Sequence, residues 1–219
     1  MKLTEKMISV LKNFAAINSS IALSKGNVVK TMDPLKTIVG IAKLDVEFPS
    51  EACIYDLTKF ISVLSLYKDP DIEFESNHFV ITEGNRKTNY TYAEKRLLIL
   101  PPEKDIELPS EDVVVPLNWE DLETVVKAAS KLQLPEIAIS CAGESVYIRA
   151  INSEVPNADT FDIETNVNSS HEFNFILKSE KLKLIPQNYE VKISKAGLAK
   201  FEGEYVTYFI PCDKKSTFK

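Results

Sequence analysis

The two halves of this 219-residue chain repeat each other. Residues Ile21–Gly26 read IALSKG, and the related stretch IAISCAG occupies Ile137–Gly143. An amphipathic helix is predicted before each copy, and each helix places a lysine, Lys12 or Lys127, opposite its apolar stripe. A duplicated unit that presents a lysine twice is hard to reconcile with an ordinary enzyme, and it predicts a scaffold that repeats one surface.

The length and the cysteine usage bound the class of protein. A chain of this length holds one large domain or two of about 110 residues. It has no run of about 20 apolar residues that could span a membrane, and Met1–Lys6 becomes charged too early for a signal peptide, so we expect a cytoplasmic protein. Cys53, Cys141 and Cys212 are isolated and lie far from both histidines, which argues against a disulfide framework and against a zinc site.

The charge balance constrains the possible partners. The net charge is -6, and the sequence pI is about 5.2, which argues against DNA binding by the whole surface. Net charge is a sum, however, and it does not exclude a basic patch on one side of the molecule.

Helical periodicity and capping residues predict helices at residues 4–17, 57–67 and 119–132, with Thr4, Asp56 and Asn118 as N-caps. A fourth helix is expected where residues 176–182 echo residues 54–60. The intervening runs alternate between apolar and polar residues and predict strands and hairpins; they are residues 21–24, 28–32, 37–46, 72–75, 79–82, 88–92, 113–115, 137–140, 146–148, 161–167, 189–194, 199–202 and 206–210.

The order of elements is therefore helix plus strands, four times. This order predicts an α+β fold in which each of two similar domains packs two helices on antiparallel sheets. Four prolines between residues 101 and 116 predict an extended interdomain linker, because proline restricts its neighbours and removes ladder donors. We expect domains at residues 1–100 and 117–219.

The sequence contains no recognisable catalytic constellation. Its six glycines are scattered, and the HExxH and GxSxG motifs are absent. The carboxylate pairs Asp69/Asp71 and Glu73/Glu75 are interpreted as a solvated turn and a sheet face, and His78 and His171 as surface residues. We expect a protein that is not an enzyme and that needs no cofactor and no metal.

Lysines are the remaining signal. Seven fall on predicted helices: Lys6, Lys12, Lys59, Lys127, Lys131, Lys178 and Lys181. One lysine-bearing helix face is usually only solvated, but equivalent faces in a repeat converge on one surface if rotation relates the units. Such a surface would hold phosphates without reading bases, since the attraction is electrostatic. The acidic residues would then occupy the opposite surface.

Three regions of the sequence resemble one family. They are Val10–Ser19, the stretch Ile54–Leu57 with Phe60 and Leu64–Leu66, and the C-terminal set Phe173–Ile176, Asn188–Tyr189 and Ala199–Glu204. These residues resemble the DNA polymerase sliding clamps of tailed bacteriophages, in the right order and over nearly the whole chain.

The resemblance implies an assembly and a set of partners. Clamps of this kind are homotrimers in which six similar domains form a ring around duplex DNA, with helices lining the hole and sheets forming the outer wall. Subunits join edge to edge, which hides exposed strand edges. The ring slides on DNA and tethers the polymerase in the cytoplasm of the infected bacterial host. An ATP-dependent clamp loader opens it, and the clamp itself hydrolyses nothing. A role in late transcription is also implied for phages of this type.

The resemblance also assigns roles to residues. By position, Lys12, Lys59, Lys127 and Lys181 correspond to the inner helix faces, with Lys6, Lys131 and Lys178 as neighbours. A pocket for a partner's peptide is expected around the linker and the final strand, at Val113, Val115, Tyr208, Phe209 and Pro211. The alternative is a duplicated α+β interaction or structural module that never meets DNA; an enzyme ranks third, and no membrane partner is expected.

Overall fold

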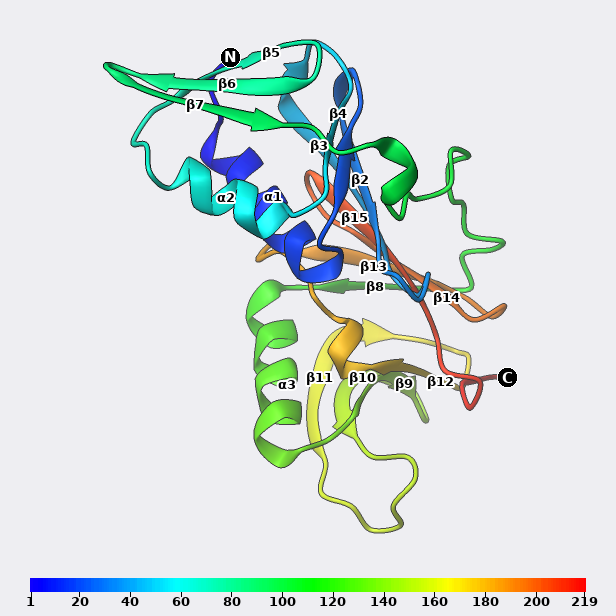
Figure 1. The fold of residues 1–219 in the computed structure, drawn as a ribbon. Helices are drawn as coiled ribbons and strands as arrows, with labels where there is room; N and C mark the ends of the chain where they lie inside the picture. Colours follow the sequence, from blue (N-terminus) through cyan, green and yellow to red (C-terminus); the bar gives the residue numbers. More distant parts are fainter. The chain divides into compact units, whose positions relative to one another are not determined.

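The computed structural model describes residues 1–219, which divide into two units, residues 1–104 and residues 105–219 (Figure 1). Every strand pair within each unit is antiparallel, and the sheets are combined with α-helices. The expected α+β class with two similar domains is therefore confirmed.

Unit 1 begins with a helix and contains two groups of strands. In chain order its elements are α1 (Glu5–Ile17), β1 (Ile21–Leu23), β2 (Gly26–Met32), β3 (Val39–Phe48), β4 (Ala52–Ile54), α2 (Leu57–Leu64), β5 (Asp71–Phe74), β6 (His78–Glu83), β7 (Arg86–Thr91) and the short 3₁₀-helix η1 (Lys95–Leu97). Strands β4, β1, β2 and β3 lie side by side in that order, and β5, β6 and β7 form a separate sheet. The two helices lie side by side (Figure 1).

Local chemistry explains where the helices of unit 1 begin. The Thr4 side chain accepts a hydrogen bond from the N–H of Met7, and the Asp56 side chain accepts one from Lys59, so the predicted N-caps of α1 and α2 are confirmed. Helix α2 ends at Leu64, earlier than expected, because the N–H groups of Leu66 and Tyr67 bond three positions back instead of four.

The core of unit 1 joins helix α1 to the sheet at close range. A Cβ atom added at Gly40 in β3 would lie 2.9 Å from the ring of Phe14 in α1, so only glycine allows this approach. On the other sheet, the Phe79 ring in β6 lies 4.8 Å from that of Phe74 and 5.0 Å from that of Phe60 in α2. Apolar burial thus fixes one helix on each group of strands.

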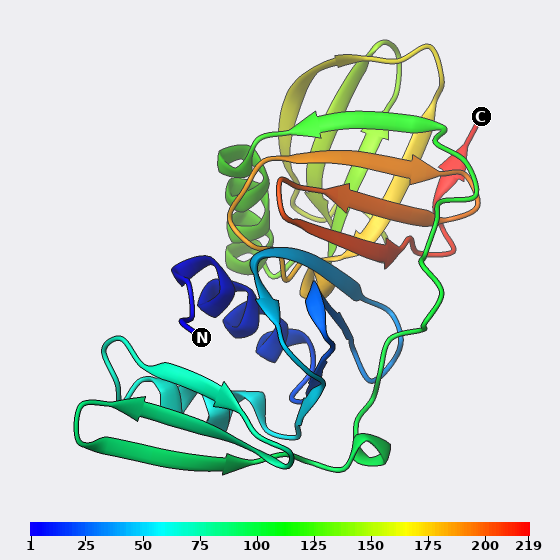
Figure 2. The same cartoon turned by 90° about the horizontal axis from the view of Figure 1, so that it is seen from above.

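Unit 2 repeats the plan with a longer first strand. Its elements are β8 (Val113–Leu117), α3 (Trp119–Leu132), β9 (Glu136–Cys141), β10 (Ser145–Ile151), β11 (Phe161–Asn168), β12 (Phe173–Lys178), η2 (Ser179–Lys181), β13 (Tyr189–Ser194), β14 (Leu198–Glu202), β15 (Val206–Pro211) and β16 (Thr217–Phe218). Strands β15, β14, β13 and β8 are neighbours in that order, and β11, β10, β9, β12 and β16 form the second sheet. In Figure 2, strands β15, β14, β13 and β8 lie in front of this second sheet.

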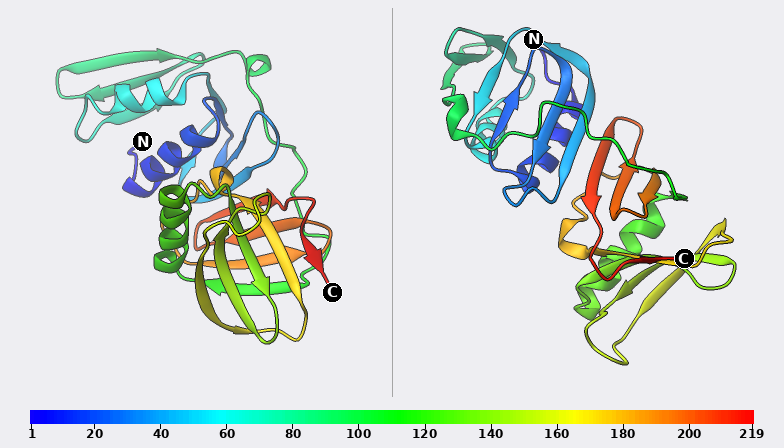
Figure 3. Two further views of the ribbon diagram at one scale, coloured as in Figure 1. Left: turned by 90° about the horizontal axis from the view of Figure 1, so that it is seen from below. Right: turned by 90° about the vertical axis from the view of Figure 1, so that its right-hand side faces the viewer.

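Helix α3 has the bounds that the sequence predicts, and the Asn118 side chain caps it by accepting from the N–H of Asp121. Its buried residues are Leu122, Val125 and Ala129, and it packs on β9, β10 and β11. Gln133 ends the helix in the left-handed conformation, at φ 56°. Figure 3 shows α3 along one side of this sheet.

The expected fourth helix at residues 176–182 is wrong. Strand β12 continues to Lys178, and only the 3₁₀ turn η2 follows it. Pro186 disfavours helical backbone just before it, and the side chains of Leu182, Leu184 and Ile185 are all buried. The backbone of Ile185 is satisfied by tyrosine hydroxyls instead of a helical ladder: its N–H donates to Tyr208, and its carbonyl accepts from Tyr189.

The thirteen predicted strand runs all correspond to strands, within a few residues at the ends, whereas the sequence reading missed β4, β12 and β16. The repeated turn is also present. Gly26 and Gly143 have φ values of 107° and 101°, a region that favours glycine, at matching places in the two units.

Candidate nucleic-acid interface

Two lysines of unit 1 stand exposed on helices without an ionic partner. Lys12 lies on α1, opposite the buried residues Val10, Leu11 and Phe14, and Lys59 lies on α2. Neither ammonium group forms an ion pair within the chain. Lys6, on the first turns of α1, is only partly exposed and is engaged within the chain. The side of unit 1 that carries α1 and α2 therefore offers two ammonium groups to solvent.

Helices α1 and α2 also share a small apolar hollow beside Lys12. It has a volume of about 170 Å³ and is lined chiefly by Ile8 and Leu11 of α1 and by Ile61 and Leu64 of α2. The Lys12 stem forms part of its rim. Lysine stems commonly cover apolar surface while the charged end reaches water, so this packing directs the ammonium group outward.

In unit 2, helix α3 has a charge gradient along its length. Glu120 and Asp121 occupy its first turn, and Lys131 its last turn, which is the arrangement that the helix dipole favours. Lys127 pairs with Glu123 one turn earlier, with 2.7 Å between the nitrogen and the oxygen. Lys131 forms no ion pair. The exposed side of α3 is thus acidic at its start and basic at its end.

The other two predicted lysines of unit 2 are not on an α-helix. Lys178 ends β12, and its ammonium group lies 2.7 Å from Glu136 and 3.3 Å from Asp213. Lys181, in η2, is mostly covered, with 18% of its side chain exposed, and it has contacts within the chain. The assignment of these two lysines to a helix face is corrected, because residues 176–182 do not form that helix.

Lys178 is the ion-pair partner of a buried group, since the carboxylate of Glu136 is 0% exposed. Burial alone would raise the pKa of Glu136. The hydrogen bonds from Lys178 and from the N–H of Ser153 outweigh burial and hold the pKa of Glu136 below its ordinary value. A buried carboxylate requires such partners, so Lys178 is part of the structural core of unit 2.

Acidic side chains are concentrated on strands of unit 2. On β13, Lys192 lies within 3.4 Å of oxygens from Glu111, Glu190 and Glu202, and hydrogen bonds to Glu190 and Glu202 raise the pKa of its ammonium group. Strand β11 presents Asp162 and Glu164 to solvent. These carboxylates contribute to the net negative charge of the chain, and none of them lies on α1 or α2.

Strands β7 and β11 are among the sheet edges that lack a partner strand on one side. Strand β7 pairs only with β6, and β11 pairs only with β10. Both alternate between half-buried and exposed residues, and both present free backbone groups along one side. On the face away from the helices, β7 carries Lys87 and β11 carries Glu164. Unpaired edges of this kind are templates for strand addition.

The predicted partner pocket does not come together. Val113 and Val115 lie in β8, and Tyr208, Phe209 and Pro211 lie in β15, at opposite edges of the four strands β15, β14, β13 and β8. All except Pro211 are buried: Val113 and Val115 share one face of β8, whereas Tyr208 and Phe209 are adjacent in β15 and are covered on its two opposite faces.

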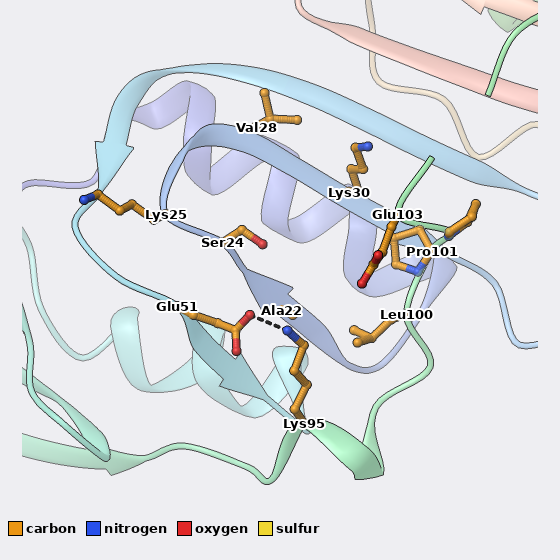
Figure 4. Close-up of a pocket in the computed structure, with 11 residues that line it drawn as sticks. Ala22, Ser24, Lys25, Val28, Lys30, Glu51, Lys95, Leu100, Pro101 and Glu103 are labelled. Atoms are coloured by element: carbon orange, nitrogen blue, oxygen red, sulfur yellow. Dashed lines mark hydrogen bonds and ion pairs between the residues drawn. The ribbon is translucent and has the colours of Figure 1, made fainter. Parts of the chain in front are cut away.

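A hollow does exist where the linker begins (Figure 4). Its volume is about 330 Å³, and it lies over β1 and β2 on the face away from α1, which we call the outer face of unit 1. The segment Leu100–Glu103 crosses this face, as Figure 3 (right) also shows. Val28 and Lys30 line the strand side, and Lys95 pairs with Glu51 at 2.5 Å. The proline-rich composition of the linker was the only sequence signal for this feature.

The chain shows neither a cluster suited to a metal ion nor a helix suited to span a membrane. No cluster of three or more histidine, cysteine, aspartate or glutamate residues is arranged to hold a metal ion. None of the helices has both the length and the apolar character needed to cross a bilayer.

Comparisons with known proteins identify the family. The family described as "DNA polymerase processivity factor" matches residues 2–99, and "gp45 sliding clamp, C terminal" matches residues 114–214. A sliding clamp of Vibrio phage KVP40 is 33% identical, over 96% of this chain and 98% of its own. The sliding clamp of Escherichia phage RB69 is 32% identical over 99% of each chain.

Solved structures show the same fold at lower identity. The PCNA of A. fulgidus, bound to the C-terminal region of FEN-1, superimposes with a TM-score of 0.73 and 14% identity, over 97% of each chain. The PCNA of Thermococcus kodakaraensis gives a TM-score of 0.71, with 14% identity over 95% of this chain and 96% of its own. At these identities the likeness establishes the PCNA-like clamp fold alone. The matched families and the phage relatives place the chain in the phage gp45-type sliding clamps, the non-enzymatic processivity factors of DNA polymerase.

Proposed function

We propose that three copies of this chain close into a ring around duplex DNA, with the α-helices toward the DNA. The observation that carries this proposal is the set of exposed lysines without ion pairs on all three α-helices, namely Lys12, Lys59 and Lys131. Ammonium groups with no internal partner are available to phosphates, and their attraction does not depend on base sequence. Weak contacts of this kind permit sliding.

Other predicted lysines would contribute in graded ways. Lys127 is paired with Glu123 on an exposed helix surface, a kind of pair worth only about 0.3–0.5 kcal/mol, so a phosphate competes readily for it. Lys6 lies at the start of α1, six residues before Lys12, and is engaged within the chain. Lys178 and Lys181 are engaged within unit 2, and we propose that they influence the DNA mainly through the field of their charge.

Ring closure would use two of the free sheet edges. We propose that β7 of one subunit pairs with β11 of the next, and that three such heterologous contacts close the ring. The half-buried residues of each strand would stay on the helix side. On the other side, Lys87 of one copy would meet Glu164 or Asp162 of its neighbour, which supports this pairing over contact between like edges.

Partner binding is proposed at a different place from the sequence-based pocket. The hollow of Figure 4 adjoins the linker and combines Val28, Leu100 and Pro101 with lysine side chains, which suits a short apolar peptide with a carboxylate. We propose it for the polymerase peptide. That the C-terminal region of FEN-1 is bound to A. fulgidus PCNA supports peptide docking in this fold.

We also propose loading by an ATP-dependent clamp loader, a role in late transcription, and action in the cytoplasm of the infected bacterial host. We also propose residues 1–100 and 117–219 as the two clamp domains, with residues 101–116 as the connection between them. The last residues of that connection form part of β8.

The test of the DNA-facing role is the double variant Lys12→Glu with Lys127→Glu. We expect normal folding and a severalfold loss of primer-extension processivity in the presence of the loader. The matched control is Lys43→Glu with Lys214→Glu, which makes the same charge change, one residue per unit, outside the helices. Unchanged processivity in the first variant, or equal losses in both, would remove these lysines from the DNA-facing role.

The second candidate function is an interaction module that does not encircle DNA. Retention on circular and linear DNA distinguishes it from the ring. After loading, a ring stays on a closed circle in moderate salt and leaves once the DNA is cut, whereas a protein that binds without encircling shows no such difference.

A further inference from the structure

The C-terminal tail lies along the outer edge of strand β12, on the side away from β9. Its last residues form β16, in which Phe218 pairs with Phe173 and Thr217 pairs with Asn174. Figure 3 (left) shows this tail in red at the rim of the sheet. Without the tail, β12 would be the last strand of its sheet.

The tail also binds the backbone of β12 outside the short strand β16. It first makes a turn, in which the N–H of Ser216 donates to the carbonyl of Asp213. Both ends of this turn reach Ile176: the N–H of Asp213 donates to its carbonyl at 2.7 Å, and its N–H donates to the Ser216 hydroxyl at 2.9 Å. At the other end, the N–H of Lys219 donates to the carbonyl of Glu172 at 2.8 Å. The tail thus satisfies backbone groups of β12 that would otherwise be unpaired.

Side chains hold the tail against the sheet at both of its ends. The ring of Phe218 lies 6.2 Å from that of Phe175 and 5.2 Å from that of His171. The carboxylate of Asp213 lies 3.3 Å from the ammonium group of Lys178, at the end of β12. Apolar contact and an ion pair therefore add to the hydrogen bonds in keeping the tail in place.

The covered strand differs in composition from the open edges β7 and β11. Residues Phe173–Leu177 of β12 read FNFIL and include no charge, no proline and no glycine. Segments of this kind pair readily with another chain when their edge is exposed. Strand β7 carries Arg86 and Lys87, and β11 carries Asp162 and Glu164, so pairing between like edges brings like charges together. The first five residues of β12 lack this protection, and the tail covers their edge instead.

We propose that the C-terminal tail is an edge cover, which prevents two copies of this chain from pairing through β12. The occupant of the uncovered edge is a second copy, because antiparallel pairing of β12 with itself joins the same uncharged strand of both chains in a two-fold contact. The inference concerns an edge that the proposed ring does not use, so it does not depend on ring closure.

The test detaches the tail in the full-length protein by the double variant Thr217→Pro with Phe218→Asp. The proline removes a backbone donor of β16, and the aspartate places a carboxylate where the ring lies beside Phe175. Both changes are made in a chain that also carries Glu164→Lys, which weakens the proposed ring contact. We expect sedimentation velocity to show dimers, with a dissociation constant at least tenfold lower than that of the Glu164→Lys chain.

The matched control is Lys214→Pro in the same Glu164→Lys chain. Lys214 is the second residue of the turn that Asp213 begins, a position that accepts proline, and it lies outside β16. We expect this control to change the dissociation constant less than twofold.

Hydrogen exchange locates the pairing at the edge of β12. In the wild type the N–H of Ile176 should exchange slowly at every protein concentration. In the double variant it should exchange at least tenfold faster in dilute solution and become slow again as the concentration rises, because a second copy then binds it. The N–H of Val191, in the core of unit 2, should stay protected throughout and shows that the variant is folded. If the double variant does not fold, Phe218→Ala alone is measured in the same two ways.

An unchanged dissociation constant would overturn the proposal, and so would exchange at Ile176 that stays fast at high concentration or stays slow in dilute solution. A gain in association as large in Lys214→Pro as in the double variant would overturn it too. Failure of the ring is a separate result, since it shows in the oligomeric state of the wild type and leaves these comparisons unaffected.

Discussion

The two units share one plan but use their lysines differently. In unit 1 the chain after β4 forms the helix α2, and Lys59 projects from it without an ion pair. In unit 2 the chain after β12 makes only the turn η2, and Lys178 binds the buried Glu136. A repeated strand framework can therefore support either an exposed charge or an internal one. Position in a repeat alone does not determine what a lysine does.

The sheet edges differ between the units as well. Among the free edges, β7 of unit 1 begins with Arg86 and Lys87, whereas β11 of unit 2 carries Asp162 and Glu164. The units also differ at their start. Unit 2 begins with the full strand β8, whereas unit 1 begins with only the isolated bridge between Lys2 and Asp71. Opposite charges on the two edges favour contact between unlike units of neighbouring copies.

The largest expected effect tests the internal role of Lys178. Lys178→Ala removes the cation beside a fully buried carboxylate, and we expect it to lower the free energy of unfolding by roughly 2–3 kcal/mol, since breaking a buried pair is strongly destabilising. Lys59→Ala, on the exposed face of α2, should change it by less than about 0.5 kcal/mol. Urea denaturation measures both.

A second substitution separates charge from packing at this site. Lys178→Met combined with Glu136→Gln removes both charges, and we expect it to recover most of the lost stability. If Lys178→Ala were as mild as Lys59→Ala, the contrast between the units would disappear.

Much of this contrast could not be predicted from the sequence. The caps Thr4, Asp56 and Asn118 are local signals, and they located three helices. The helix predicted at residues 176–182 does not form, because the structure of this segment depends on contacts with other parts of the chain. The tyrosine hydroxyls that bind Ile185 come from 4 and 23 residues away, and Glu136 lies 42 residues before Lys178.

The next effect concerns the two edges. Glu164→Lys would place like charges together if β11 of one subunit meets β7 of the next, and we expect association of subunits to weaken about tenfold, or about 1.4 kcal/mol per interface. Lys87→Glu in the same chain should restore it. Sedimentation velocity over a dilution series measures the association, and failure of the second change to restore it would contradict this strand pairing.

The DNA-facing lysines provide a smaller and more specific comparison. Lys12→Glu with Lys59→Glu should reduce retention of loaded protein on circular DNA and flatten its dependence on salt, because fewer phosphates are neutralised. Lys181→Glu should have a weaker effect, since that lysine is mostly covered. Equal losses from the two variants would show that coverage in the structure does not determine the contribution of a lysine.

The smallest expected effect depends on pH. The pKa of Glu136 in the folded chain lies below its ordinary value of 4.5, so its charged form stabilises the fold above that pH. This contribution is lost as the pH falls through the folded pKa. The Lys178→Met, Glu136→Gln variant should therefore lose less stability than the wild type between about pH 5 and pH 3. Parallel pH curves would contradict the role of this pair.

The candidate docking surfaces could not be predicted from the sequence for a related reason. Val113 and Val115 look like an exposed linker beside prolines, but pairing with β13 turns them inward. The hollow of Figure 4 depends on the register of β1 with β2 and with β4, three separate strands. Register of this kind is set by the whole sheet, and no single segment encodes it.

The most direct test of the proposed ring is the mass of the native assembly. Native mass spectrometry at micromolar concentration should give a species of three times the 24.6 kDa mass of one chain, and Glu164→Lys should increase the share of single chains. A species of one chain at every concentration up to tens of micromolar, unchanged by salt, would contradict ring closure through β7 and β11.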